Sequence, residues 1–194
     1  MGLSERQKEI IEASLEIIGE SGIQALTIRN ISKKVGISEP AIYRHFDNKT
    51  QILLTILEFF IVNNNQIISY ETAKGKKVED IIEMMFTNFV RTFTQHPHLI
   101  SVIFSEEIFR NDNVFKEKSS AIINENLDML KQIIIRGQMQ EEVKPELNPE
   151  HIAVILMGSL RLFVKRWQMS DFSFDFQEEG KKLQETFLKL IIKV

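Results

Sequence analysis

Residues 22–49 read GIQALTIRNISKKVGISEPAIYRHFDNK, and this stretch decides the fold of the first part of the chain. Thr27 can cap one short helix, and Gly36 follows where a left-handed residue commonly ends a helix. Ser38 can cap a second short helix that has a proline in its first turn. Two short helices joined by a glycine-bearing turn predict a helix-turn-helix motif.

Apolar residues at helical spacing continue on both sides of this motif, and no segment has the clean alternation of an amphipathic strand. We expect a first helix from Ser4 to Glu20, a long helix from Lys49 to about Glu71, and further helices at 78–95, 97–110, 114–136, 149–169 and 174–193. The predicted fold is all-α with about nine helices. A three-helix domain over 1–50 is joined by the long helix to a second helical domain over 51–194.

The composition is that of an ordinary globular protein. Of 194 residues, 43% are hydrophobic and 26% are charged. The absence of cysteine excludes disulfides, thiolate metal sites and cysteine nucleophiles. The first residues carry charges and no apolar signal core, and no uncharged stretch approaches the length of a membrane span. We therefore expect a cytoplasmic protein with no membrane partner.

The net charge of −3 at first argues against a nucleic-acid partner, because a nucleic-acid-binding surface is basic. The charge is unevenly distributed, however. Five basic and two acidic side chains lie between Ile28 and Lys49, so this segment carries +3 and the remaining residues carry −6. A basic segment on a helix-turn-helix motif predicts binding to double-stranded DNA.

The same segment resembles the DNA-binding domain of the tetracycline-repressor (TetR) family of transcriptional regulators. The resemblance covers about Glu9 to Leu57 and rests on family spacing of Gly22, Thr27, Gly36-Ile37-Ser38, Tyr43-x-x-Phe46 and Lys49. The chain length and helix number also fit the family. The resemblance implies a homodimer that binds a palindromic operator, most often as a repressor, and is released by a small-molecule effector.

In a helix-turn-helix protein the second helix lies in the major groove with its N-terminal residues at the base edges. We expect DNA contacts from Thr27, Arg29, Ser38, Glu39, Pro40, Ala41, Tyr43, Arg44, His45 and Lys49. The resemblance assigns phosphate contacts to Thr27, Tyr43, His45 and Lys49. For Tyr43 and Lys49 the alternative is a purely structural role.

Two of these residues have a choice of roles at the DNA. Arg44 can pair with a guanine edge or contact only a phosphate. Glu39 can accept from a cytosine amine, or serve only as the acid that favours a first helical turn.

The second domain is rich in phenylalanine, which is typical of a packed core or of an apolar pocket between helices. Our candidates for a pocket are Met85, Phe86, Phe89, Phe93, Phe104 and Arg161. A pocket of this composition favours an apolar or amphipathic effector. Arg161 can face the pocket or pair with a carboxylate or carbonyl group.

The last two predicted helices suit a two-fold dimer interface, because the first of them is apolar nearly all round. Gly158 lies in its middle, where close approach of a second helix would explain a glycine. The candidate interface residues are Ile155, Gly158, Leu162, Leu183, Phe187, Leu190 and Ile191.

Other classes of protein are less well supported by the sequence. It has no nucleophile elbow, phosphate-binding loop, dinucleotide fingerprint or zinc-protease motif, so we expect no enzyme and no cofactor. His96-Pro97-His98 is interpreted as a helix boundary with exposed imidazoles rather than a metal site, and we expect no metal. The alternative function is a helical carrier or protein-interaction module without DNA binding.

Overall fold

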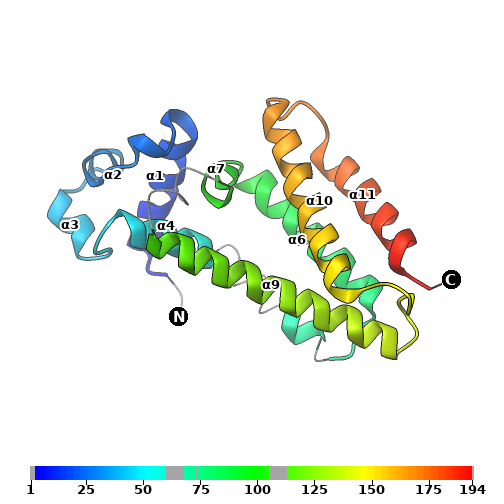
Figure 1. Cartoon of the computed structure of the whole chain (residues 1–194). Helices are drawn as coiled ribbons and strands as arrows, with labels where there is room; N and C mark the ends of the chain where they lie inside the picture. The colour runs from blue at the N-terminus through cyan, green and yellow to red at the C-terminus, as the bar shows by residue number, and fades with distance from the viewer. Residues whose placement is uncertain (1–2, 60–67, 73, 105–112, 194) are drawn as a thin grey trace. The chain divides into compact units, whose positions relative to one another are not determined.

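The computed structural model describes residues 3–59, 68–72, 74–104 and 113–193 (Figure 1). These residues form ten helices and no strand beyond an isolated bridge between Val143 and Ile192, so the predicted all-α class is confirmed. The chain divides into two compact units. The described part has no helix that is long and apolar enough to cross a membrane.

The first unit takes in the described residues of 1–61 and 96–120, and the second those of 62–95 and 121–194. The first contains α1 (Glu5–Ser21), the 3-10 helix η1 (Ile23–Ala25), α2 (Ile28–Val35), α3 (Glu39–Tyr43), α4 (Lys49–Leu57) and α7 (Leu99–Ile103). The second contains α6 (Val78–Gln95), α10 (Pro149–Met169) and α11 (Phe176–Ile191). Helix α9 (Asn113–Met139) begins in the first unit and continues in the second.

Parts of two predicted helices lie outside the described residues. The helix expected from Lys49 to Glu71 crosses 60–67, and the helix expected at 97–110 is described only up to residue 104. The predicted domain boundary at residue 50 remains a prediction, because the first compact unit also takes in α4 and α7.

Helix α1 forms the centre of the first unit. It begins with the predicted cap at Ser4, whose Oγ accepts from the Gln7 amide at 3.3 Å while the Ser4 amide donates to Gln7 Oε1 at 3.0 Å. Its inner face buries Ile10, Ile11, Ala13, Ser14, Leu15, Ile17 and Ile18. Burial of this face, rather than the propensity of single residues, accounts for most of the stability of such a helix.

Helix α7 packs on the last turns of α1 through an unusually close contact. A Cβ atom added to Gly19 would lie 1.8 Å from Nδ1 of His98, so only glycine leaves room for this ring. His96 and His98 are both half-buried, which corrects the expectation of exposed imidazoles. Burial lowers the pKa of His96 from its usual value, and the charge of Glu12 partly opposes that shift.

The second unit has a continuous apolar core. Its buried members come from residue 68, α6, α9, the segment before α10, α10 and α11, and are Ile68, Val78, Ile81, Ile82, Phe86, Leu130, Ile133, Ile134, Val143, Ile152, Ala153, Leu156, Leu160, Phe187 and Ile191. Aromatic rings extend this packing. Trp167 stacks on Phe176 with ring centres 4.3 Å apart, and Phe163 stacks on Phe176 at 4.6 Å.

Gly137 does not end its helix, contrary to the expected range of 114–136. Helix α9 continues to Met139, and a Cβ on Gly137 would lie 2.5 Å from Val78 Cγ2 and 2.7 Å from Val143 Cγ2. The glycine is therefore required by packing rather than by a turn. The left-handed conformation after this helix is taken instead by Glu141, with φ of 59°.

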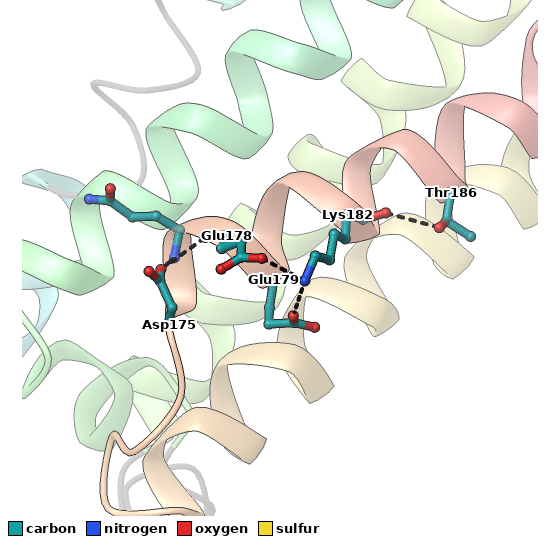
Figure 2. A network of polar contacts seen from close by, with 6 residues as sticks. Asp175, Glu178, Glu179, Lys182 and Thr186 are labelled. Carbon is teal, nitrogen blue, oxygen red and sulfur yellow. Dashed lines mark hydrogen bonds and ion pairs between the residues drawn. The ribbon is translucent and has the colours of Figure 1, made fainter.

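Helix α11 begins sharply at Asp175 (Figure 2). The Asp175 carboxylate accepts from the amides of Gln177 and Glu178, both at 2.9 Å. One turn later Lys182 pairs with the carboxylates of Glu178 and Glu179, each at 2.8 Å, and both raise its pKa. These ion pairs are exposed and contribute little, so the cap is the main local feature that fixes where α11 starts.

A substitution at Gly180 tests the packing of α11 on its neighbours. In Gly180→Ala the new Cβ would lie 2.7 Å from Val90 Cγ2 and 3.5 Å from a carbon of the Phe163 ring. Overpacking costs about 1–3 kcal/mol, against a gain in helix propensity of about 1 kcal/mol. We expect a lower free energy of unfolding in urea. The exposed neighbour Lys181→Ala should show no such loss, and a stabilised Gly180→Ala would contradict this packing.

Candidate nucleic-acid interface

The turn between α2 and α3 has the geometry that the sequence predicts. Gly36 adopts the left-handed conformation with φ of 77° and ψ of 30°. Its amide donates to the Ser32 carbonyl at 2.9 Å, and the Ile37 amide donates to the same oxygen at 3.0 Å. The turn is thus closed by two hydrogen bonds, which fixes the direction in which α3 leaves α2.

Helix α3 has one buried face and one exposed face. Ile42 is completely buried, and Phe46, just after the helix, is almost so. Ser38, Glu39, Pro40, Tyr43 and Arg44 are exposed, while Ala41 and His45 are half-buried. Ser38 lies at the predicted cap position, although its side chain makes no capping hydrogen bond. The predicted contact residues of α3 are therefore accessible, or partly so, above an apolar base.

The exposure of Tyr43 bears on whether its role is structural or functional. Its side chain is 52% exposed, although tyrosine in a helical core usually buries its ring. The purely structural role considered for Tyr43 would require a buried ring. Its exposure at the end of α3 instead leaves the phenol available to a ligand.

Helix α4 begins with a side-chain cap that the sequence analysis missed. The Asn48 carboxamide oxygen accepts from the Gln51 amide at 2.9 Å. Lys49 follows in the first turn, where a cation is opposed by the helix dipole and no acidic residue offsets it. A lysine in this position weakens the helix slightly, but with the helix N-terminus it forms a site attractive to an anion.

Thr27 caps α2, as predicted. Its Oγ1 accepts from the Asn30 amide at 3.1 Å, and the Asn30 carboxamide donates to the Ala25 carbonyl at 2.8 Å. Arg29 is exposed in the same first turn. The threonine hydroxyl still has its own hydrogen to donate, so capping and a contact with an acceptor are compatible.

Only part of the positive charge of this segment is free to act on a ligand. Lys34 is held by two carboxylates of α1, with Nζ 2.9 Å from Glu16 and 3.1 Å from Glu20, and these hydrogen bonds raise its pKa. Within the described part of the chain, no carboxylate lies within ion-pair distance of Arg29, Arg44 or Lys49. The same holds for the exposed Lys33, so these four cations form the local positive surface.

Comparison with family models decides the assignment. The model described as "Bacterial regulatory proteins, tetR family" matches residues 10–56, and the model "YsiA-like protein, C-terminal region" matches residues 57–194. The chain belongs to the TetR family. It is a DNA-binding regulator of that family, and its relatives are transcriptional regulators rather than enzymes.

Individual relatives agree with this assignment. The fatty acid metabolism regulator protein of Bacillus subtilis (strain 168) is 23% identical over 171 residues, covering 86% of each chain. The solved fatty acid degradation regulator FadR of Bacillus halodurans is 19% identical, with a TM-score of 0.85 over 97% of each chain. FadR of Bacillus subtilis, solved in complex with stearoyl-CoA, is 22% identical, with a TM-score of 0.77 over 93% of this chain and 97% of that chain.

In this TetR-family chain the candidate pocket residues fall into different environments. Met85 and Phe89 of α6 are half-buried, whereas Phe86 and Phe93 are buried in the apolar packing of the second unit. Phe104 belongs to the first unit, and Arg161 is exposed on α10. Of the six candidates, Met85 and Phe89 are therefore the ones that combine apolar surroundings with accessible surface.

The candidate dimer residues also divide. Ile155, Gly158, Leu162 and Leu190 are exposed, Leu183 is half-buried, and Phe187 and Ile191 are buried in the core of this chain. Phe187 is only 4% exposed and packs on the ring of Phe86, so it offers no surface to a partner. An apolar stripe has the same spacing whether it faces its own core or a second chain, which is why the sequence grouped these residues together.

Sequence reasoning missed two features of the second unit. Val154 and Met169 of α10 are exposed on the same face as Ile155 and Leu162. Their helical spacing was the signal that places them on that face. Asn88 of α6 is a buried polar residue. A single amide within the run Phe86-Thr-Asn-Phe-Val90 was the available signal.

Proposed function

We propose that the chain is a ligand-responsive transcriptional repressor that binds a palindromic operator as a homodimer and is released by an amphipathic effector. The observation that carries this proposal is the structure of α3. Its exposed Tyr43 and Arg44 accompany the buried Ile42. Arg44 and the other cations of the motif, Arg29, Lys33 and Lys49, have no acidic partner among the described residues. A rigidly supported, basic and polar helix face is what groove recognition requires.

Each predicted contact has a role that its position supports. We assign Ser38, Glu39, Pro40 and Ala41 to the base edges, because they form the first turn of α3. Thr27, Arg29, Tyr43, His45 and Lys49 are assigned to phosphates, which position a protein on DNA without specifying sequence. Arg44, exposed at the end of α3, is able to reach a base or a phosphate.

Selection of binding sites from a pool of random duplexes tests this function. Full-length protein should enrich a palindromic site whose half-sites are about one helical turn apart, because a two-fold dimer presents two reading helices. Effector release then follows if ligand binding changes the separation of these helices. Failure to enrich any palindrome would contradict the regulator function and favour a helical carrier.

Two substitutions test the phosphate contacts. Tyr43→Ala and Lys49→Ala should each weaken binding about tenfold for the selected site and for unrelated DNA alike, since each removes a hydrogen bond to a charged group. Lys49→Ala should also reduce the salt dependence of binding by about one counterion. Titrations at several salt concentrations measure both effects.

Lys34→Ala is the matched control for these variants, because its ammonium is already held by Glu16 and Glu20. An equal loss for Lys34→Ala would show that the effect is general electrostatics and not the assigned surface. Arg44→Ala separates its two roles: it relaxes one base position in the selected site if Arg44 reads an edge, and weakens all sequences alike if it contacts phosphate.

The homodimer is assigned to the exposed face of α10. Val154, Ile155 and Leu162 are 51%, 52% and 62% exposed, and together with Gly158 they form one stripe at helical spacing. Among the described residues, no atom lies within 4 Å of a Cβ placed on Gly158, so they give no reason for a glycine there. Close approach of the partner's helix would explain it. Arg161 is exposed between these residues and is assigned to this face rather than to the pocket.

A charge placed on this stripe tests the interface. Ile155→Glu should shift the protein from dimer to monomer in sedimentation velocity, because it buries an unpaired carboxylate at an apolar interface. Met139→Glu is a matched control, since Met139 is 81% exposed and lies at the end of α9. A dimer that persists in Ile155→Glu but dissociates in Met139→Glu would contradict the assignment.

The effector is assigned to the second unit, beside Met85 and Phe89 of α6. Both side chains are half-buried and pack against the apolar core of the second unit, which favours a ligand with an apolar portion. The similarity to a regulator solved in complex with stearoyl-CoA supports an effector with a long acyl chain and a polar head.

A further inference from the structure

The inward face of α6 is half-buried along the middle of its later turns and buried along both edges. Met85, Phe89 and Thr92 follow one another at helical spacing and are all half-buried. On one side this stripe is flanked by Ile81 and Asn88, and on the other by Ile82, Phe86 and Phe93, all of which are buried. In a filled core the middle of such a face would be the least accessible part. Met85, Phe89 and Thr92 therefore keep accessible surface that a ligand could cover.

Asn88 lies on the edge of this stripe, one turn from both Met85 and Thr92. It is only 8% exposed, although it is polar. Arg91, which is exposed, donates from Nη2 to Asn88 Oδ1 at 2.8 Å. The part of the chain that the structure describes provides no acceptor for the other end of the amide, Nδ2.

The contact with Arg91 determines which end of the amide is available. A guanidinium can only donate, so it holds the carboxamide oxygen on its own side and leaves the N–H groups of Nδ2 on the other. Nδ2 is not among the buried polar atoms that lack a partner, so it keeps some accessible surface and can be reached by a ligand. The group that satisfies Nδ2 must be an acceptor, and along an apolar stripe a carbonyl oxygen at the head of an acyl chain meets that requirement.

We propose that Asn88 donates a hydrogen bond from Nδ2 to the carbonyl oxygen of an acyl effector, whose chain lies along Met85 and Phe89. This inference rests on the proposed effector site and names the chemical group that the site recognises. Arg91 is a positioning residue, because it acts on the effector only by orienting the Asn88 amide. The site thereby selects acyl compounds, including thioesters, over alkyl compounds of the same length.

Paired ligands test the inference on the full-length protein. Stearoyl-CoA and its thioether analogue, octadecyl-CoA, differ in the carbonyl oxygen, and calorimetry gives the ratio of their dissociation constants. We expect native protein to bind the thioester about tenfold more tightly, as one additional hydrogen bond implies. Asn88→Leu should bind both ligands alike, with the affinity for the thioether retained. Its retained thioether binding reports that the site is still folded.

Control variants make the outcome decisive. Thr87→Leu, on the exposed side of α6, should keep the native ratio. Asn88→Asp preserves size and the contact with Arg91 but has no N–H donor, so it should lose the preference as Asn88→Leu does. Arg91→Leu should reduce the preference by freeing the amide to turn. A native ratio in Asn88→Leu or Asn88→Asp, or native protein that has no preference or binds neither ligand, overturns the inference.

DNA binding measured in parallel separates this inference from the proposed function. Protein that binds its selected operator but does not distinguish the two ligands refutes the role of Asn88 and leaves the regulator function intact. Protein that prefers the thioester but binds no operator supports the role of Asn88 and refutes the regulator function.

Discussion

The position of helix α3 depends on the burial of Ile42 and Phe46 on its inner side. Helix α3 has only five residues, and a helix of that length has no stability of its own in water. Its position is therefore set entirely by these two anchors, by the glycine turn that precedes it and by the capped start of α4 that follows it. Because every one of these constraints lies on the inner side, the outer side of α3 is free to vary in sequence without loss of the fold.

The positive charge is concentrated on the same helix-turn-helix segment. The chain carries −3 overall, but the helix-turn-helix segment carries +3, and the acidic excess lies elsewhere. Lys34 shows that a local count still overstates the usable charge, because two carboxylates of α1 hold it. The cations that remain are Arg29, Lys33, Arg44 and Lys49. The acidic remainder would disfavour contacts of the rest of the molecule with DNA, which sharpens the preference for this one surface.

Local signals in the sequence predicted the elements well. Ser4 and Thr27 cap the helices that they were expected to cap, and the helices expected at 78–95 and 149–169 have those bounds in the structure. These features depend on a few neighbouring residues, so a single sequence contains the information. The exposed face of α3 followed for the same reason, since its apolar positions are spaced to face one side.

Features that depend on distant parts of the chain could not be predicted in this way. Gly137 has the sequence appearance of a helix end, yet it is required by Val78 and Val143, which approach it from elsewhere. Phe187 and Leu190 belong to one helix and one apolar pattern, but one is buried in the core and the other is exposed. Asn88 was passed over because its significance lies in the burial of its amide and not in any motif.

The contact between Gly19 and His98 makes two distant positions interdependent. A side chain at position 19 is compatible with the fold only if position 98 carries something smaller than an imidazole, or if α7 moves away from α1. Related sequences should therefore change at these positions together or not at all. The contact joins α1 to a segment that follows α6, so the two positions lie far apart in the sequence. Paired change at them would therefore show that the packing of α1 against α7 constrains the evolution of both segments.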